Sequence, residues 1–269
     1  MKFTHKIHSS LLSRTIDIVV VGAGGTGSAL LPRLAQLDHA LLELGHPKGL
    51  NVTVYDSDIV SASNIGRQGF FQADIGQNKA SVLVNRINMC FGKTWVAVPL
   101  RVTNFTYLDA DIVIGCVDTR KARSAIVAAI RSHETYYIDS GNAENTGQVV
   151  IGEIGSPTTM ARPDRLPTIA DLFPEMLDIT LDATDDRPSC SVAESLRKQS
   201  LVINSFMAIE IFNLLWMLFR HGELKYSGRF VNLTSGTSNP IRINTDVWAS
   251  MGYIAPSAKD TCITNKKAA

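Results

Sequence analysis

A buried strand that runs directly into a glycine-rich turn and a helix constrains this chain more than any other feature. Residues 16–21 read IDIVVV, a β-branched run typical of a strand buried on both faces. The turn GAGGTGS follows at once, residues 29–44 carry apolar side chains at helical spacing, and residues 51–55 (NVTVY) form a second strand that ends at Asp56. This order is a βαβ unit, and its parallel crossover predicts an α/β fold with a Rossmann-like, doubly wound, mostly parallel sheet.

The rest of the chain continues this alternation and then changes in texture. Further strands are expected at 95–102, 110–117 and 136–140, an antiparallel strand at 148–154, and helices at 78–91 and 122–133. Residues 155–188 are rich in proline and acidic residues and show little periodicity, which predicts a long functional or mobile loop. A helix over 200–219 and paired strands at 228–233 and 240–244 follow.

We therefore expect a single domain built from three segments. Residues 1–154 form the Rossmann-like core, and residues 155–190 form a long crossover loop. Residues 191–269 supply a helix and an antiparallel hairpin that complete the same domain, with a loosely held tail.

The composition excludes several classes of protein. With 269 residues, 45% of them hydrophobic and 19% charged, the chain is neither disordered nor collagenous. Lys and Arg number 26 against 25 Asp and Glu, and this near balance indicates no nucleic-acid partner. The first fourteen residues lack the apolar segment of a signal peptide, so we expect a cytoplasmic protein.

The apolar run at residues 200–219 is long enough to be considered as a membrane span. It carries Asn204, Glu210 and Asn213, which are costly in hydrocarbon. We interpret it as a helix of the core or of a dimer interface, and expect no membrane association.

The glycine turn contains the pattern G-x-G-x-x-G at Gly22, Gly24 and Gly27, with Gly25 between them. Such a turn lets backbone approach a phosphate chain at a helix N-terminus. Nicotinamide, flavin and ATP-binding folds all use it, and the glycines can also serve helix–strand packing alone. Asp56 is placed for ribose hydroxyls, although it lies further from the turn than the usual ~20 residues.

Residues 56–68, DSDIVSASNIGRQ, resemble the signature D-x-D-x-V-x-x-S-N-L-x-R-Q of the ThiF/MoeB/E1 superfamily of ubiquitin-like-protein activating enzymes. Lys79 in DIGQNKA and Asp118 in CVDTRKAR follow in the order of that family. The resemblance covers residues 16–154 with high specificity and residues 200–244 more loosely. Its narrowest form is to the ThiF-type protein of bacterial PRTRC gene clusters.

The resemblance implies binding of ATP and Mg²⁺. Asp56 would hold the ribose, Asp118 would serve magnesium and catalysis, and the remaining ATP contacts would come from Gly22, Gly24, Gly25, Gly27, Asn64, Arg67, Gln68 and Lys79. Adenylating a carboxylate brings one anion against the phosphates of another, so catalysis rests on positioning and charge stabilisation. A planar arginine fork and a lysine point charge suit that task.

Two departures from the family matter. MoeB-type relatives supply an extra arginine from the partner subunit in an N-terminal R-Y-x-R-Q stretch, whereas Arg14 here lies in a different context. Many relatives hold zinc with two C-x-x-C pairs, but the four cysteines of this chain are scattered and form no such pair. We therefore expect no structural zinc.

Cys190 in RPSCS stands where E1-like enzymes that form a thioester carry their nucleophile. A thiolate suits acyl capture, and a following helix would lower the pKa of this thiol through its dipole. The alternative is an ordinary cysteine in a helix-capping turn. Cys116, next to the end of a buried strand, is expected to be core packing.

The leading hypothesis is an ATP-dependent adenylyltransferase that activates the C-terminal carboxylate of a ubiquitin-like β-grasp protein, with possible thioester formation on Cys190. By resemblance it would be a homodimer. The alternatives are an NAD-dependent oxidoreductase, a non-catalytic E1-like scaffold, and an enzyme that adenylates a small molecule or a tRNA base. The oxidoreductase has no reason to place Asn64, Arg67 and Gln68 in one loop.

Overall fold

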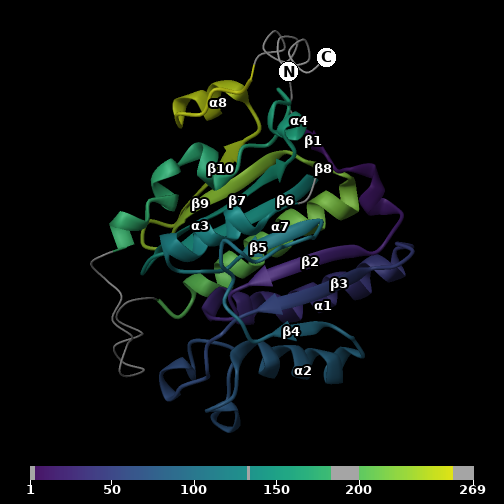
Figure 1. The fold of residues 1–269 in the computed structure, drawn as a ribbon, viewed down its shortest axis with the longest axis vertical. Coiled ribbons are helices and arrows are strands. Elements are labelled where there is room, and N and C mark those ends of the chain that lie inside the picture. Colours follow the sequence, from purple (N-terminus) through teal and green to yellow (C-terminus); the bar gives the residue numbers. More distant parts are fainter. Residues whose placement is uncertain (1–3, 132–133, 183–199, 257–269) are drawn as a thin grey trace.

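The computed structural model describes residues 4–131, 134–182 and 200–256. A mixed sheet crosses the molecule in the order β10-β9-β7-β6-β5-β2-β3-β4 (Figure 1). The strands from β6 to β4 are parallel to one another, and β7, β9 and β10 are antiparallel to their neighbours. The predicted doubly wound, mostly parallel α/β fold with an antiparallel C-terminal extension is confirmed.

The parallel strands begin with β2, which is the predicted run, and the edge strand β4 is the shortest of them. Their bounds are β2 (Ile16–Val21), β3 (Leu50–Tyr55), β4 (Val96–Val98), β5 (Ile112–Gly115) and β6 (Glu134–Asn142). The strand predicted over 95–102 is reduced to β4, because β4 pairs only with the last residues of β3. The antiparallel strands are β7 (Thr146–Gly155), β9 (Tyr226–Asn232) and β10 (Thr237–Arg242).

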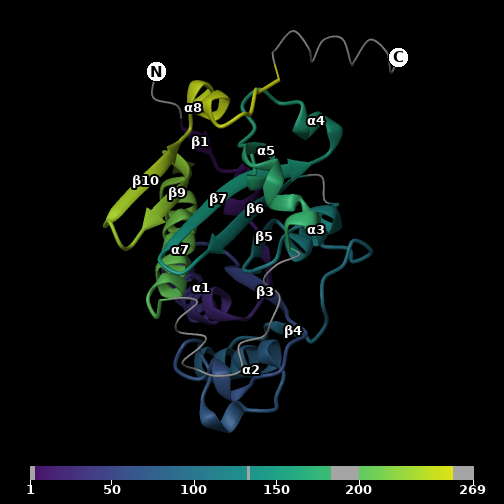
Figure 2. The ribbon, with the colours of Figure 1, turned by 90° about the vertical axis from the view of Figure 1, so that its left-hand side faces the viewer.

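Helices cover both faces of the sheet. Figure 2 shows α1 (Gly25–Glu43) and α7 (Ile203–His221) on one face, with α3 (Arg120–Ala129) and α5 (Ile169–Leu172) on the other. Helix α2 (Lys79–Phe91) packs beside α1 and against β3 and β4. Helix α3 is shorter than predicted, since Ile130 leaves the helix to bridge Leu108.

Helix α7 is long and apolar enough to cross a membrane by length and composition, but 56% of its most apolar window is buried inside the protein. It packs along α1 and under β6 and β7. The three polar residues noted in its sequence find partners: Asn204 accepts a hydrogen bond from Thr26 Oγ1 at 3.2 Å, and Asn213 donates one to Tyr226 at 2.7 Å. Glu210 pairs with Arg229 at 3.0 Å. Core packing accounts for the apolar composition of this helix.

The proline-rich segment after β7 is more ordered than its composition predicts. It contains α4 (Pro157–Met160), α5 and two 3₁₀ turns, Pro174–Leu177 and Ile179–Asp182. The prediction of a loop over 155–188 is therefore wrong for its first part, because buried apolar residues such as Leu166, Ile169 and Leu172 anchor the segment to the sheet. Its last part lies outside the described residues.

The described fold also contains a small two-stranded sheet and a helix after β10. The N-terminal strand β1 (His5–Lys6) pairs with β8 (Glu223–Leu224) in a separate two-stranded sheet. After β10 the chain forms helix α8 (Thr245–Ser250), which was not predicted from the sequence; its Trp248 is buried.

Arg165 clamps the proline-rich segment. Its guanidinium is 2% exposed and donates to both carboxylate oxygens of Asp171 at 2.9 Å, to the Glu153 carbonyl at 2.9 Å and to the Tyr253 hydroxyl at 3.0 Å. Burial tends to raise the pKa of Asp171, but the hydrogen bonds and charge of Arg165 outweigh it, and the pKa of this carboxyl is lowered.

We predict that Asp171→Asn lowers the free energy of unfolding by about 3 kcal/mol at pH 7, because the Arg165 charge would remain buried without a counter-ion. The contribution of Asp171 is present above its unfolded pKa of about 3.9 and is lost as the pH falls through its lower folded value. Urea unfolding at several pH values should show the gap between wild type and variant closing under acid. Asp164→Asn, at an 80% exposed carboxylate, is the matched control and should cost less than about 0.5 kcal/mol. Equal losses in both variants would contradict the clamp.

Candidate functional site

The order of the strands places a cleft at the carboxyl ends of β2 and β5. The chain leaves β2 toward β3 and β4, then returns to the other side of β2 to form β5 and β6. Where the winding direction reverses in such a sheet, the flanking loops separate and ligands bind outside the carboxyl ends of the strands. The glycine turn after β2, Asp56 after β3 and Asp118 after β5 all lie at this edge.

The glycines of the turn divide into two kinds. At Gly22 φ is +97°, and an added Cβ would lie 2.5 Å from the Cys116 carbonyl oxygen; at Gly27 a Cβ would lie 2.0 Å from the Gly22 carbonyl oxygen. A Cβ on Gly25 would meet the Asn204 amide at 2.5 Å. Close contact with the backbone at Gly22 and Cys116 and with the Asn204 side chain of α7 therefore explains these three glycines.

Gly24 is different, because a Cβ built there meets nothing within 4 Å. Gly24 is the N-cap of α1, makes no side-chain capping hydrogen bond, and has no acidic residue in the helix turn that follows. The positive end of the helix dipole thus faces open space next to a glycine that packing does not require. This is the arrangement that admits a phosphate.

Asp56 fastens the turn to the end of β3. Its carboxylate accepts hydrogen bonds from the Ala23 N–H at 2.6 Å and the Asp58 N–H at 2.7 Å. Burial raises the pKa of Asp56, although these backbone donors and the charge of Lys79 act in the opposite direction. The residue holds the turn in place as well as offering oxygens at the cleft.

The loop after Asp56 is folded by its own side chains. Asn64 is buried and accepts hydrogen bonds from the Ser61 N–H at 2.9 Å and the Ser61 hydroxyl at 3.2 Å. The Gln68 N–H donates to the Asn64 carbonyl at 3.0 Å, and the Gly69 N–H donates to Ser28 Oγ at 2.9 Å. Asn64 thereby shapes the loop, and Ser28 attaches the loop to the first turn of α1.

Arg67 lies on this loop, in the wall of a pocket of about 430 Å³ beside the first turn of α1. Gly25, Ser28, Gln68 and Arg33 also line the pocket. Burial lowers the pKa of Arg67, and the negative charge of Asp118 partly opposes this shift. Asp118 itself is exposed at the end of β5.

Lys79 begins α2 and turns its ammonium group back toward the same edge. It is 8% exposed as a residue, and its Nζ lies 3.0 Å from the carboxylate of Asp58. Asn78 fixes this placement: its side chain accepts from the Ser81 N–H at 3.0 Å and donates to the carbonyls of Asp56 and Asp58 at 2.8 and 3.1 Å. One amide thus joins the end of β3 to the start of α2.

Most of the predicted site residues are therefore brought to the edge of the sheet formed by the carboxyl ends of β2, β3 and β5. Gly22, Gly24, Gly25, Gly27, Asp56, Arg67, Gln68, Lys79 and Asp118 surround the cleft, and Asn64 stands behind it. Cys190 lies outside the described residues. Cys116 is packed under the turn, and burial raises the pKa of its thiol to about 12, which keeps it protonated.

Arg14 lies at the opposite, amino-terminal edge of the sheet. Its guanidinium forms a bidentate ion pair with Asp111, the residue before β5. This arginine is therefore occupied far from the cleft in its own chain.

Comparison with known proteins identifies the family. The sequence profile described as the ThiF family matches residues 9–247. This chain belongs to the ThiF family. No curated protein matches it.

Two solved structures resemble this ThiF-family chain. A crystal structure of E. coli MccB with AMPCPP and SeMet MccA aligns with a TM-score of 0.53 and 15% identity, over 85% of this chain and 64% of that one. A structure of E. coli MccB with succinimide gives a TM-score of 0.52 and 14% identity, over 85% and 63%. At this identity the likeness establishes a shared ThiF-type fold. The chain spans slightly less than two thirds of the MccB chains.

Sequence reasoning missed Arg33, which lies on α1 two turns after the glycines and lines the same pocket as Arg67. Nothing in the local pattern marks it, since arginine at an exposed-looking helix position is common. Asp58 could have been found, because it is the second aspartate of the D-x-D signature. Its contact with Lys79 needed the fold of the loop.

We predict that Gly24→Ala and Gly27→Ala separate ligand binding from packing. Gly24→Ala should cost only about 1 kcal/mol of folding stability, because alanine is a poorer N-cap than glycine, yet weaken nucleotide binding, because the new methyl group would occupy the approach to α1. Gly27→Ala should destabilise by about 3 kcal/mol through collision with the Gly22 carbonyl. Urea unfolding and a nucleotide titration measure the two effects. Undiminished nucleotide binding by Gly24→Ala would show that ligands do not approach over this turn.

Proposed function

We propose that this ThiF-family chain is an ATP-dependent adenylyltransferase of E1-like type. The observation that supports it most is the collection of cationic side chains around an open helix N-terminus: Arg67 and Arg33 line the pocket beside α1, and Lys79 points to the same edge from α2. A polyanion such as a triphosphate is the ligand that this charge pattern suits.

Each residue would act on a different part of the nucleotide. Asp56 would accept hydrogen bonds from the ribose hydroxyls, the backbone at Gly24 would receive the phosphates, and Arg67 would offer its planar fork. The Asn64 and Gln68 amides would orient phosphate or ribose through neutral hydrogen bonds. Asp118, exposed at the end of β5, offers the oxygen ligands that Mg²⁺ prefers, and the ion would neutralise phosphate charge there.

The reaction would join two anions. A carboxylate oxygen of the acceptor attacks the α-phosphorus of ATP, the bond from that phosphorus to the bridging oxygen breaks, and pyrophosphate leaves with the electron pair. An acyl adenylate remains. Arg67 and Lys79 would lower the barrier by neutralising the phosphates while the backbone of the turn holds them in line.

We further propose that the acceptor is the C-terminal carboxylate of a ubiquitin-like β-grasp protein, in a PRTRC-type setting in the cytoplasm. The D-x-D and S-N-x-x-R-Q motifs support this, as does the fold shared with MccB, which was crystallised with AMPCPP, a methylene analogue of ATP, and MccA. The enzyme would act as a homodimer. The Cys190 thiolate would then attack the carbonyl carbon of the acyl adenylate, forming a thioester and releasing AMP.

An oxidoreductase that uses the same turn for NAD is less well supported. Binding of a dinucleotide requires a carboxylate that accepts from the ribose and a glycine turn that receives the phosphates. It does not require three cationic side chains, Arg33, Arg67 and Lys79, near one helix N-terminus. A non-catalytic scaffold is also disfavoured, because this chain keeps both Arg67 and Asp118 at the cleft.

ATP–pyrophosphate exchange in the presence of candidate ubiquitin-like proteins tests the proposal. Wild type should exchange, Asp118→Ala should not, and Cys190→Ala should exchange normally while losing any thiol-sensitive conjugate. Arg242→Ala, at an exposed position on β10, is the control. Surface substitutions of this kind usually change stability by no more than about 0.5 kcal/mol, so its exchange rate should match that of wild type. Exchange that persists in Asp118→Ala would overturn the role of that residue, and thermal stabilisation by NAD but not by MgATP would overturn the function.

We also predict that Arg33→Ala and Arg67→Ala each weaken MgATP binding, by about 1.5–3 kcal/mol for a lost charge-assisted contact. Isothermal titration against wild type and Arg242→Ala gives the comparison. Unchanged affinity in Arg33→Ala would show that this arginine does not contact the nucleotide. Its role would then be local to α1, where it donates a hydrogen bond to the Ala29 carbonyl.

A further inference from the structure

A second cluster of chemically capable side chains lies at the opposite end of the sheet from the cleft. His5 on β1 and His8 just after it approach Glu153, which β7 places opposite Tyr136 of β6. Among the described residues, these three are the only group of histidine, cysteine and carboxylate side chains compact enough to hold a metal ion; their ligand atoms all lie within 4.8 Å of one another.

The distances are close to those of a metal site. His8 Nε2 lies 2.8 Å from Glu153 Oε1, and His5 Nδ1 lies 3.8 Å from Glu153 Oε2. Ligand atoms around a tetrahedral zinc ion, at bonds of 2.0–2.1 Å, are separated by about 3.4 Å. Small side-chain rotations would bring both imidazoles and the carboxylate onto one ion.

The second nitrogen of each imidazole also faces an oxygen. His5 Nε2 is 2.7 Å from the Tyr136 hydroxyl, and His8 Nδ1 is 3.8 Å from the Glu134 carboxylate. Metal-bound histidines almost always have such an outer partner, which fixes the tautomer and the ring orientation. The Glu153 carboxylate is likewise oriented, because its Oε2 accepts the Leu166 N–H at 2.8 Å.

The cluster is largely closed to solvent. His5 is 7% exposed, and Glu153 is fully buried.

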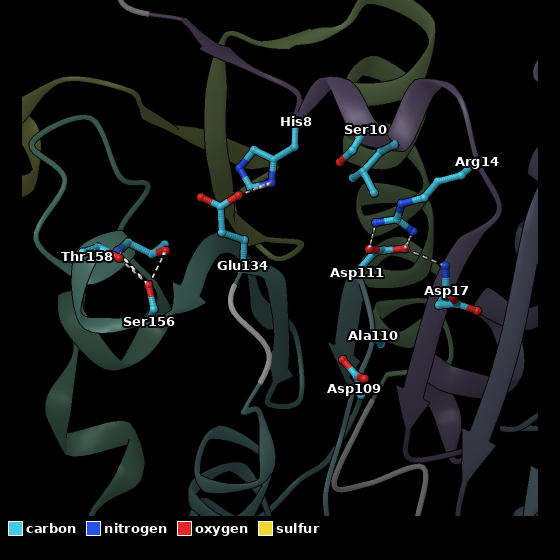
Figure 3. A pocket seen from close by; sticks show the side chains of 12 residues that line it. His8, Ser10, Arg14, Asp17, Asp109, Ala110, Asp111, Glu134, Ser156 and Thr158 are labelled. Carbon is cyan, nitrogen blue, oxygen red and sulfur yellow. Dashed lines mark hydrogen bonds and ion pairs between the residues drawn. The ribbon is translucent and has the colours of Figure 1, made fainter.

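His8 is the member of the cluster that solvent can reach. It lines a pocket of about 570 Å³ together with Glu134, Arg14 and Asp111 (Figure 3). A water can reach an ion bound to His8 from this side, and it would supply the fourth position that two imidazoles and one carboxylate leave open.

Arg162 is the group that opposes a cation here. One of its nitrogens lies 3.3 Å from Glu153 Oε1. The arginine is 30% exposed and also pairs with Glu134 at 3.1 Å and Asp164 at 3.2 Å, so it keeps two carboxylates if it yields Glu153. Arg162 and a metal ion would therefore compete for the Glu153 carboxylate.

We propose that His5, His8 and Glu153 form a binding site for one divalent transition ion of the zinc class. The ion would tie the N-terminal segment to β6 and β7 at the edge of the sheet remote from the nucleotide cleft. The expectation that this chain holds no structural zinc rested on the absence of cysteine pairs. The proposed site contains no cysteine. The proposal is independent of the adenylation proposed above.

Zinc titration of the full chain tests the site. The chain is stripped with EDTA, returned to chelator-free buffer without nucleotide, and titrated with Zn²⁺ in competition with a chromophoric chelator. We expect one equivalent to bind and the thermal midpoint to rise. Substitution with Co²⁺ should give a visible spectrum without the intense near-ultraviolet band of cobalt–thiolate bonds, which excludes the cysteines as ligands.

Four variants make the test specific. His8→Ala, at a half-buried position, should lose more affinity than the roughly 10–100-fold that an outer-shell partner contributes, and Tyr136→Phe should lose within that range. Arg162→Met should bind Zn²⁺ more tightly than wild type, because it removes the competing charge and keeps the aliphatic stem. His39→Ala, at an exposed histidine on α1, should match wild type.

Three results would overturn the proposal. They are the absence of stoichiometric binding, equal affinity in His8→Ala and wild type, or an affinity that Arg162→Met leaves unchanged or weakens. The cluster would then be a hydrogen-bonded network in which Arg162 is the natural counter-ion of Glu153. Circular dichroism of each variant ensures that a loss of binding is not a loss of fold.

Discussion

The close packing of the glycine turn between β2, β5 and α1 is the contact on which the rest of the site depends. Only a residue without Cβ can lie against the Cys116 carbonyl at Gly22 or against the Gly22 carbonyl at Gly27. This approach sets where α1 begins and therefore where its positive end points. Asp56 fixes the same turn from β3 through the Ala23 N–H. The helix N-terminus, the acidic strand ends and the basic loop are consequently held at one edge.

The C-terminal third of the described chain supports the turn from behind. Helix α7 lies along α1, and its Asn204 both receives the Thr26 hydroxyl and occupies the space that a side chain at Gly25 would need. Glu210 and Asn213, six and nine residues further along the helix, contact Arg229 and Tyr226 of β9. The polar residues of this apolar helix thus connect the glycine turn to the antiparallel extension, and α7 links the two halves of the sheet.

The two edges of the sheet carry different chemistry. At the carboxyl ends of the parallel strands, positive groups surround space that a polyanion can fill. At the amino ends, Arg14 forms an ion pair with Asp111, and two imidazoles lie next to the buried carboxylate of Glu153. This division follows from the parallel strands, because each strand presents its preceding loop to one edge and its following loop to the other.

The sequence by itself determined the βαβ unit, the doubly wound sheet and most of the cleft residues. Those features depend on local order: a β-branched run, a glycine turn, a helix and a signature loop follow one another, and parallel strand ends must meet at one edge. Element boundaries were less well predicted where pairing partners decide them, as in β4 and at the end of α3. The proline-rich segment was wrongly expected to be a loop, because its helices are stabilised by Arg165 and by contacts with β7 rather than by any local pattern.

Only the tertiary structure decided which side chains share a site across long separations. Arg33 joins Arg67 in one pocket because the Ser28 hydroxyl attaches the signature loop to α1. His5 and His8 meet Glu153 because β1 pairs with β8 and the start of the chain then crosses β6 and β7. Asn64 lies behind the cleft, where it shapes the loop. The physical reason is the same in each case: local sequence fixes periodicity and turns, whereas contacts between residues far apart in the chain depend on how the assembled sheet packs.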